Sequence, residues 1–378
     1  MKLAHISDLH IGKRVNEFSL IEDQEYILDE ILSIIDKNQV DGVIIAGDVY
    51  DKSTPSAEAV TVFDSFLVKL AKRRLEIFII SGNHDSSERL AFGNKLFDAS
   101  GVHISPVYDG TFNPITLKDD FGSINVYLLP FIKPMHVKRY TDNEVSSYTE
   151  AVKIAISQMN VNPKERNVLL THQFVTGSER CDSEELSVGG SDNVDASVMN
   201  DFDYVALGHL HKPQSCGRDT IRYCGSPLKY SFSESKDKKS VTIVTLGAKN
   251  DVKIDTCPLV PKRDMVEIKG NFEKITDPDY YMQTTYRSDY MHITLTDEQD
   301  VPDAINRLRI IYKNLMKLDY DNKRTRENQE ISAVECIEKK TPLELFSELY
   351  EKQNNEKMTK EQIELVSSLI EKIWEDEQ

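Results

Sequence analysis

Metal-binding residue types occur at five places in this sequence, each directly after a run of apolar residues. The motifs are an Asp-x-His, a Gly-Asp-x-x-Asp, a Gly-Asn-His-Asp, a single histidine and a Gly-His-x-His. The candidate ligands in chain order are Asp8, His10, Asp48, Asn83, His172, His209 and His211. Carboxylate, amide and imidazole groups together suit divalent first-row ions such as Mn²⁺ better than ions that prefer thiolates. The pattern therefore predicts a metal centre.

The number of candidate ligands exceeds what one ion needs. Two ions about 3.5–4 Å apart require a bridging ligand, and Asp48 is the natural bridge because a carboxylate can bind two ions. Such a pair lowers the pKa of a water molecule and stabilises the charge that develops at phosphorus during in-line attack. The predicted cofactors are two divalent metal ions, with Mn²⁺ favoured. Taken singly, the motifs also fit turns, caps or edge strands.

The elements that must position these ligands are predicted to alternate between strand and helix. The ligands follow β-type runs at 3–7, 43–46, 76–80, 168–171 and 204–208. Apolar residues at helical spacing predict helices over 17–38 and 54–72. Strand, helix, strand in this order predicts an α/β fold with a parallel sheet core. Open α/β sheets place their chemistry at the carboxyl ends of the strands, where these ligands lie.

The rest of the chain predicts further elements and two boundaries. We expect helices over 87–99 and 146–159, short strands over 102–104, 115–117 and 124–129, a long surface loop over 176–194, and hairpin strands over 222–227 and 241–246. Pro258 and Pro261 mark a boundary. Beyond them, strands over 265–269, 291–295 and 331–336 with a helix over 302–318 predict a small α+β module, followed by tail helices over 343–352 and 360–374. The predicted domains are 1–260, 261–340 and 341–378.

Composition limits the class of protein and its surroundings. No apolar run approaches the ~18 residues of a membrane span, and no secretion signal opens the chain. Five cysteines without a Cys-x-x-Cys pair predict reduced thiols and a cytoplasmic location. The net charge of −17 argues against a general nucleic-acid-binding surface. Any DNA binding is expected to be local and salt-sensitive.

The ordered motifs resemble those of the calcineurin-like metallophosphoesterase superfamily over about residues 1–245. The resemblance implies a β-sandwich flanked by helices. It assigns the first metal to Asp8, His10, Asp48 and His211, and the second to Asp48, Asn83, His172 and His209. It implies that His84 faces the substrate and helps to protonate the leaving oxygen, and that Asp51 orients His84.

Within that superfamily, the whole chain resembles the SbcD family of nuclease subunits. The resemblance is carried by residues 2–12, 47–51, 208–214 and 225–234, and by the layout of the module and tail. It implies a Mn²⁺-dependent 3′–5′ double-strand exonuclease and single-strand or hairpin endonuclease, acting in DNA repair, recombination and replication. The implied partners are DNA, the SMC-type ATPase SbcC bound by the helical tail, and a second copy bound through the nuclease domain. Archaeal and eukaryotic relatives carry His where this chain has Asp51, so a strand-rotating role of that His does not transfer.

Two other hypotheses about the function remain open. One is a stand-alone phosphoesterase acting on a small phosphodiester, a lipid precursor or a phosphoprotein, and the other is an assembly protein with vestigial chemistry. The candidate phosphate contacts are Lys13, Arg14, Arg89, Lys133 and Arg139. Each of these side chains fits a solvated surface charge equally well. The tail helices predict apolar faces made of Leu343, Leu345, Phe346, Leu349 and Tyr350, and of Ile363, Leu365, Val366, Leu369, Ile370 and Trp374. These faces fit either partner binding or packing within the chain.

Overall fold

The structure is a computed structural model that describes residues 1–179, 181–184, 193–323 and 325, with scattered positions between 343 and 367. These residues form two compact units. The first comprises Met1–Lys269, Glu273–Thr294 and Asp303–Asp319, and the second comprises Gly270–Phe272, Leu295–Pro302 and the described residues from Tyr320 onward. The domain boundaries at 260 and 340 stay predictions.

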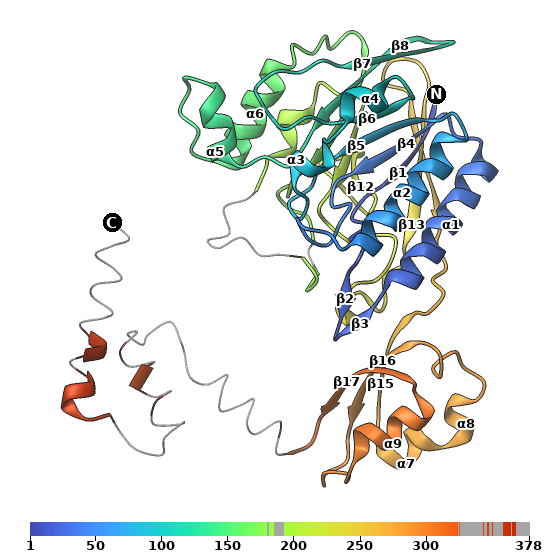
Figure 1. Cartoon of the computed structure of the whole chain (residues 1–378), viewed down its shortest axis with the longest axis vertical. Coiled ribbons are helices and arrows are strands. Elements are labelled where there is room, and N and C mark those ends of the chain that lie inside the picture. The colour runs from blue at the N-terminus through green and yellow to red at the C-terminus, as the bar shows by residue number, and fades with distance from the viewer. Residues whose placement is uncertain are drawn as a thin grey trace. The chain divides into compact units, whose positions relative to one another are not determined.

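Two six-stranded sheets form the frame of the first unit (Figure 1). The first has the order β14-β13-β1-β4-β5-β6, with bounds β1 (Lys2–Ile6), β4 (Gly42–Ala46), β5 (Glu76–Ile80), β6 (Val102–Ile104), β13 (Ser240–Leu246) and β14 (Val252–Pro258). β1, β4 and β5 are parallel, as predicted, because the chain crosses over between them through α1 (Ile21–Asn38) and α2 (Ala57–Ala71). β6 is also parallel to β5. β13 and β14 are antiparallel additions.

The second sheet repeats this plan with a mixed edge. Its order is β11-β12-β10-β9-β8-β7, with bounds β7 (Ile115–Asp119), β8 (Gly122–Leu129), β9 (Arg166–His172), β10 (Tyr204–Gly208), β11 (Gln214–Cys216) and β12 (Arg218–Tyr223). The four central strands are parallel, and both edge strands are antiparallel. The connections contain α5 (Pro134–Val137), η1 (Lys138–Tyr140), α6 (Tyr148–Gln158), η2 (Ala196–Met199) and η3 (Phe232–Glu234).

The sheets pack face to face, so their central strands are buried on both sides. Phe78 of β5, Leu170 of β9 and Tyr204 of β10 belong to the apolar layer between the sheets. Residues of α1 and α2 cover the outer face of the first sheet, and α6 covers the outer face of the second (Figure 1). The predicted β-sandwich flanked by helices is confirmed. Burial on both faces explains why these strands are continuous apolar runs.

Two predicted helices in the first hundred residues differ from the structure. The helix predicted from residue 17 begins at Ile21, because the preceding residues form the hairpin of β2 (Arg14–Val15) and β3 (Phe18–Ser19). The helix predicted over 87–99 is divided into α3 (Ser87–Leu90) and α4 (Asn94–Asp98). Gly93 lies between them with a φ of 76°, which a continuous right-handed helix cannot contain.

The third sheet contains β15 (Met265–Gly270), β16 (Tyr290–Leu295) and β17 (Asn314–Tyr320) in that order. Its helices are α7 (Phe272–Thr276), α8 (Pro278–Tyr281) and α9 (Ala304–Ile311). The helix predicted to reach 318 is therefore wrong beyond Ile311, since the last third of that run pairs as a strand. The strand predicted over 331–336 lies outside the described residues.

The tail is described at only some positions between 343 and 367, and those within 343–350 and 360–367 are helical. Gln362 Nε2 donates to the Tyr350 hydroxyl at 3.1 Å. Of the predicted apolar faces, Leu345, Leu349, Leu369, Ile370 and Trp374 lie outside the described residues, as do Arg180 and 185–192 of the long loop. No helix in the described part of the chain has the length and apolar character that crossing a membrane requires.

Candidate metal centre

The predicted ligands converge where the carboxyl ends of the two sheets meet. Loops after β1, β4 and β5 of the first sheet carry Asp8, His10, Asp48 and Asn83, whereas β9 and the loop after β10 in the second sheet supply His172, His209 and His211. Asn83 is half-buried and the other six are buried. Residues up to 203 positions apart thus share one site because two parallel sheets end at the same place.

Asp48 lies at the middle of this group. Its Oδ2 atom is 3.2 Å from His172 Nε2 and 3.7 Å from His10 Nε2. Its Oδ1 atom accepts a hydrogen bond of 2.9 Å from the main-chain N–H of His84. One carboxylate therefore faces imidazoles from both sheets, which is the position that a bridging ligand requires.

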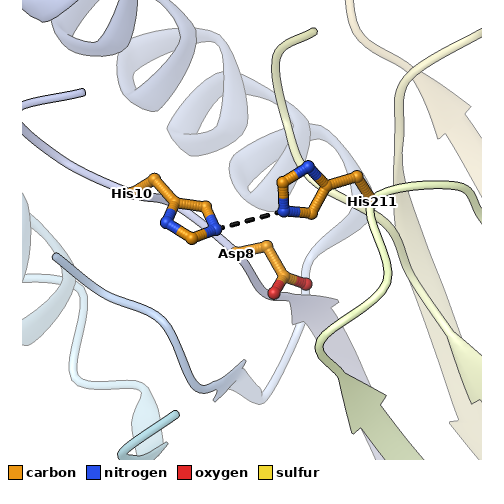
Figure 2. Close-up of side chains that lie close together, drawn as sticks. All are labelled: Asp8, His10 and His211. Atoms are coloured by element: carbon orange, nitrogen blue, oxygen red, sulfur yellow. Dashed lines mark hydrogen bonds between the residues drawn. The ribbon is translucent and has the colours of Figure 1, made fainter. Parts of the chain in front are cut away.

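The other ligands form one group on each side of Asp48. On the first side, the His10 and His211 rings face each other, with Nε2 atoms 3.1 Å apart (Figure 2). Ligand atoms of Asp8, His10 and His211 all lie within 4.8 Å of one another. On the second side, Asn83 Oδ1 lies 3.0 Å from His172 Nε2 and 2.9 Å from His209 Nδ1. The assignment of these side chains to two separate ions stays a prediction, because Asp8 also lies in one cluster with Asp48 and His172.

The backbone of the ligand loops adopts an uncommon conformation. Asp8, His10, Asp48 and His209 have φ values of 54°, 43°, 48° and 108°. Non-glycine residues rarely have positive φ, and each such residue costs on the order of 1–3 kcal/mol that surrounding contacts must offset. The fold thus holds these four side chains in directions that a relaxed loop would not choose.

Hydrogen bonds on the outer ring nitrogens fix two of the imidazoles. His172 Nδ1 donates to the Ala46 carbonyl oxygen at 2.8 Å, and His211 Nδ1 lies 2.7 Å from Ser183 Oγ. Such partners hold the proton on Nδ1 and leave the Nε2 lone pair directed into the site. His10 Nδ1 is buried without a hydrogen-bond partner among the described residues, 3.8 Å from the Asp51 carboxylate.

Burial and neighbouring charges shift the pKa values of the candidate ligands in both directions. Burial alone would raise the pKa of Asp48, but the imidazoles of His172 and His10 hold that pKa well below its usual range. Burial lowers the pKa of His10 well below its ordinary value and raises the pKa of Asp8 to about 6. Burial opposes protonation of His172, but the Asp48 carboxylate outweighs it and raises the pKa to about 9. Asp48 is thus ionised and His10 neutral near pH 7, the forms that bind metals, whereas His172 must release a proton before it binds an ion. The donor set fits two divalent ions.

The glycines of the motifs allow the ligand loops to approach one another. A Cβ atom on Gly82 would lie 2.0 Å from Asp48 Oδ1, and one on Gly208 would lie 1.9 Å from the Ala46 carbonyl oxygen. A Cβ atom on Gly47 would lie 2.4 Å from His172 Nδ1. These distances are far below a van der Waals contact, so these three motifs include glycine beside the ligand for a steric reason.

His84 lies at the rim of the site, and its contact with Asp51 differs in kind from the predicted one. The His84 ring is half-buried, and its Nδ1 lies 3.1 Å from the main-chain oxygen of Asp51. The Asp51 carboxylate instead forms an ion pair of 2.7 Å with Lys13. Asp51 therefore contacts His84 through its backbone, and its side chain holds Lys13 beside the site.

Several residues that support the ligands were not predicted. Asp85, the last residue of Gly-Asn-His-Asp, accepts hydrogen bonds from the main-chain N–H groups of Gly82, Val49 and Tyr50 at 2.9, 3.1 and 2.9 Å. Gln24 of α1 donates to the His10 carbonyl oxygen at 2.7 Å. The place of Asp85 in its motif is a usable signal, whereas a glutamine inside a helix gives none. Other described residues around His211 are Ser183, Glu184 and Glu234.

The remaining candidate phosphate contacts occupy different places. Arg89 of α3 donates to the Ser53 carbonyl oxygen at 2.7 Å. Arg14 lies in β2 and donates to the Glu17 carbonyl oxygen. Lys133 precedes α5, and Arg139 lies in η1. Among the five candidates, Lys13 has the clearest link to the site, through Asp51.

A model of the calcineurin-like phosphoesterase family matches residues 1–213, the segment that holds all seven ligands. The chain belongs to the calcineurin-like phosphoesterase family. A second model, described as the type 5 capsule protein repressor C-terminal domain, matches residues 261–354. The chain is also 31% identical over 375 residues to the SbcD component of the nuclease SbcCD of Staphylococcus epidermidis, covering 98% of each chain. The predicted resemblance to SbcD is confirmed.

Solved structures similar to this phosphoesterase chain are much more distant. A dimetal phosphatase from Danio rerio has a TM-score of 0.43 and 11% identity, covering 68% of this chain and 96% of its own. A Thermus thermophilus protein has a TM-score of 0.39 and 11% identity, covering 68% and 98%. Similarity at this distance indicates nothing about the substrate.

Gly82→Ala is expected to weaken Mn²⁺ binding by roughly tenfold or more, because the added methyl group must displace Asp48. Isothermal titration of the metal-free protein measures the affinity. Gly122→Ala is the control, since Gly122 has a φ of 105° and nothing within 4 Å of an added Cβ. It is expected to lose about 1–2 kcal/mol of stability and to keep its Mn²⁺ affinity. Equal affinities in Gly82→Ala and the unmodified protein would contradict the steric argument.

Proposed function

We propose that this chain is the Mn²⁺-dependent nuclease component of an SbcCD-type complex, acting on DNA in the cytoplasm during repair, recombination and replication. The observation that carries the proposal is the convergence of seven metal-type ligands around the buried Asp48 carboxylate. Similarity over 98% of the chain to the SbcD component of nuclease SbcCD supports DNA as the substrate. The proposed reactions are 3′–5′ exonuclease cleavage of duplex ends and endonuclease cleavage of single strands and hairpins.

The two ions would be held by the two groups of side chains beside Asp48. Asp8, His10, Asp48 and His211 would hold the first, and Asp48, Asn83, His172 and His209 the second. When bound, such a pair supplies an activated water nucleophile and stabilises the negative charge that develops on the phosphate. The protein fixes the ligands through two packed sheets, so little rearrangement is needed at the moment of reaction.

His84 is the proposed proton donor to the leaving sugar oxygen. Its Nδ1 is held by the Asp51 carbonyl oxygen, and its Nε2 lies 4.0 Å from Asp48 Oδ2, so that this edge of the ring faces the centre. A half-buried ring at the rim can contact substrate, unlike the six buried candidate ligands. Protonated at Nε2, His84 can donate that proton as the bond between phosphorus and oxygen breaks.

The C-terminal sheet favours DNA over a small phosphodiester as the substrate. β15, β16 and β17 form a separate sheet with its own helices, and a family model matches 261–354. A small-substrate phosphoesterase would leave this part of the chain without a role. We propose that 1–260 carries the nuclease, 261–340 covers bound DNA and 341–378 binds the ATPase partner.

An assay with end-labelled hairpin and linear duplex DNA in Mn²⁺, with and without the SMC-type ATPase and ATP, tests the proposed function. His84→Ala is expected to keep two bound Mn²⁺ ions and to lose roughly 10²–10⁴-fold in turnover, because only proton donation is removed. His136→Ala, on α5, serves as the control and should retain activity. Cleavage of a chromogenic small diester without any cleavage of DNA would favour the stand-alone phosphoesterase.

Truncation after residue 340 is expected to abolish co-purification with the ATPase and to leave Mn²⁺-dependent hydrolysis of a small chromogenic diester unchanged. The truncation removes the proposed partner-binding segment and none of the metal ligands. Pull-down with tagged ATPase, alongside hydrolysis by the same preparation, gives both readouts. Retained co-purification would refute the assignment of 341–378.

We also propose that two copies of the chain associate through the nuclease domain. Phe92, Leu96 and Phe97 around α3 and α4 are 83%, 80% and 46% exposed, and a cluster of large apolar side chains on a surface typically marks an interface. Leu96→Asp is expected to convert the dimer to a monomer, as measured by light scattering after size exclusion. Ile310→Asp, at a residue 78% exposed on α9, should leave the mass unchanged. A monomeric unmodified protein would overturn the dimer proposal.

A further inference from the structure

The segment 225–234 was notable in the sequence, yet the metal centre does not use it directly. It ends at Glu234, whose side chain is completely buried. Glu234 Oε1 accepts a hydrogen bond of 2.6 Å from Ser183 and one of 3.1 Å from the main-chain N–H of Tyr230. Burying a charged carboxylate is unfavourable unless its partners compensate for the lost water. We therefore expect Glu234 to have a specific role.

Lys239 is the counter-ion of Glu234 and is itself 5% exposed. Its ammonium group donates to Glu234 Oε2 at 2.5 Å, to the His211 carbonyl oxygen at 2.8 Å and to Ser226 Oγ at 3.0 Å. All three of its donors are therefore used. The ion pair is joined directly to the backbone of a metal ligand.

Ser183 connects the same carboxylate to the His211 ring. Its Oγ atom lies 2.7 Å from His211 Nδ1 and donates its single proton to Glu234 Oε1. The hydroxyl must then accept the proton on Nδ1, which leaves the Nε2 lone pair facing His10 and Asp8 (Figure 2). The neighbouring Glu184 carboxylate accepts the main-chain N–H of His211 at 2.6 Å.

We propose that Ser183 and Glu234, with Lys239 as counter-ion, are positioning residues that fix the tautomer and orientation of His211 for the first metal ion. The inference rests on the proposed function, in which His211 binds that ion. This positioning role explains why the chain contains a buried ion pair here. Such a pair often stabilises a fold no more than apolar side chains of the same size do. The ion pair holds the His211 ring in the orientation in which its Nε2 atom can bind the metal ion.

A third metal ion beside His211 is the competing explanation. Cys181 Sγ, a ring nitrogen of His211 and a Glu234 oxygen lie within 4.8 Å of one another, and these are donor types that zinc accepts. However, the Lys239 ammonium already neutralises Glu234, and Ser183 already occupies His211 Nδ1. Burial, together with the nearby carboxylates of Glu234 and Glu184, also raises the pKa of the Cys181 thiol, which disfavours the thiolate. The contacts favour positioning over a third ion.

Titration of the metal-free, full-length protein with MnCl₂ in a calorimeter tests the proposal. Ser183→Ala and Glu234→Gln are each expected to weaken binding of one ion by roughly 10–100-fold and to leave the other unchanged. The double variant should be no weaker than the more severe single variant, since both act through one chain of hydrogen bonds. Ser183→Thr retains the hydroxyl and should restore the affinity. Asp36→Asn, which breaks a surface pair with Arg73, is the control and should bind normally.

Three results would overturn the proposal. Unchanged Mn²⁺ affinity in both Ser183→Ala and Glu234→Gln would show that the network does not act on His211. If both ions bind equally more weakly and the melting temperature falls, the network has a general structural role instead. A third bound ion that is lost in Cys181→Ser would show a metal site at Glu234. An unmodified protein that binds fewer than two ions would refute the proposed function itself. Failure of the proposed function can thus be distinguished from failure of the positioning proposal.

Discussion

The buried charge of Asp48 is the constraint on which the site depends. A carboxylate away from water is stable only when positive or polar groups surround it. Here they are His172 at 3.2 Å, His10 at 3.7 Å and the His84 main-chain N–H. Because these partners come from both sheets, the packing of one sheet on the other determines the geometry around Asp48. The apolar layer between the sheets therefore supports the chemistry as well as the fold.

Most of the strands that position the site could be predicted from the sequence. β1, β4, β5, β9 and β10 are buried on both faces, so each is a continuous apolar run that ends at a polar motif. The hairpin before α1, the break at Gly93 and β17 were not predicted. In each case a short run suits two conformations, and contacts with distant residues decide between them. For β17, pairing beside β16 outweighs the helical spacing that the sequence suggests.

The convergence of the candidate ligands was easier to predict than the residues that hold them. Asp8 to His211 belong to motifs whose order and spacing are visible in the sequence. Ser183, Glu234 and Lys239 are common residue types, and their link to His211 exists only through the folded structure. The contact between Asp51 and His84 illustrates the same limit. The sequence brings the two residues together, but whether the backbone or the carboxylate makes the contact depends on Lys13.

The left-handed backbone at Asp8, His10, Asp48 and His209 also affects how this protein can change. Glycine adopts such conformations without steric penalty, and asparagine tolerates several of them. At these four positions, the stability of the metal-free protein and the proposed role as a metal ligand therefore favour different amino acids. A library selected only for heat resistance would accumulate glycine or asparagine there and would yield robust proteins without enzymatic activity.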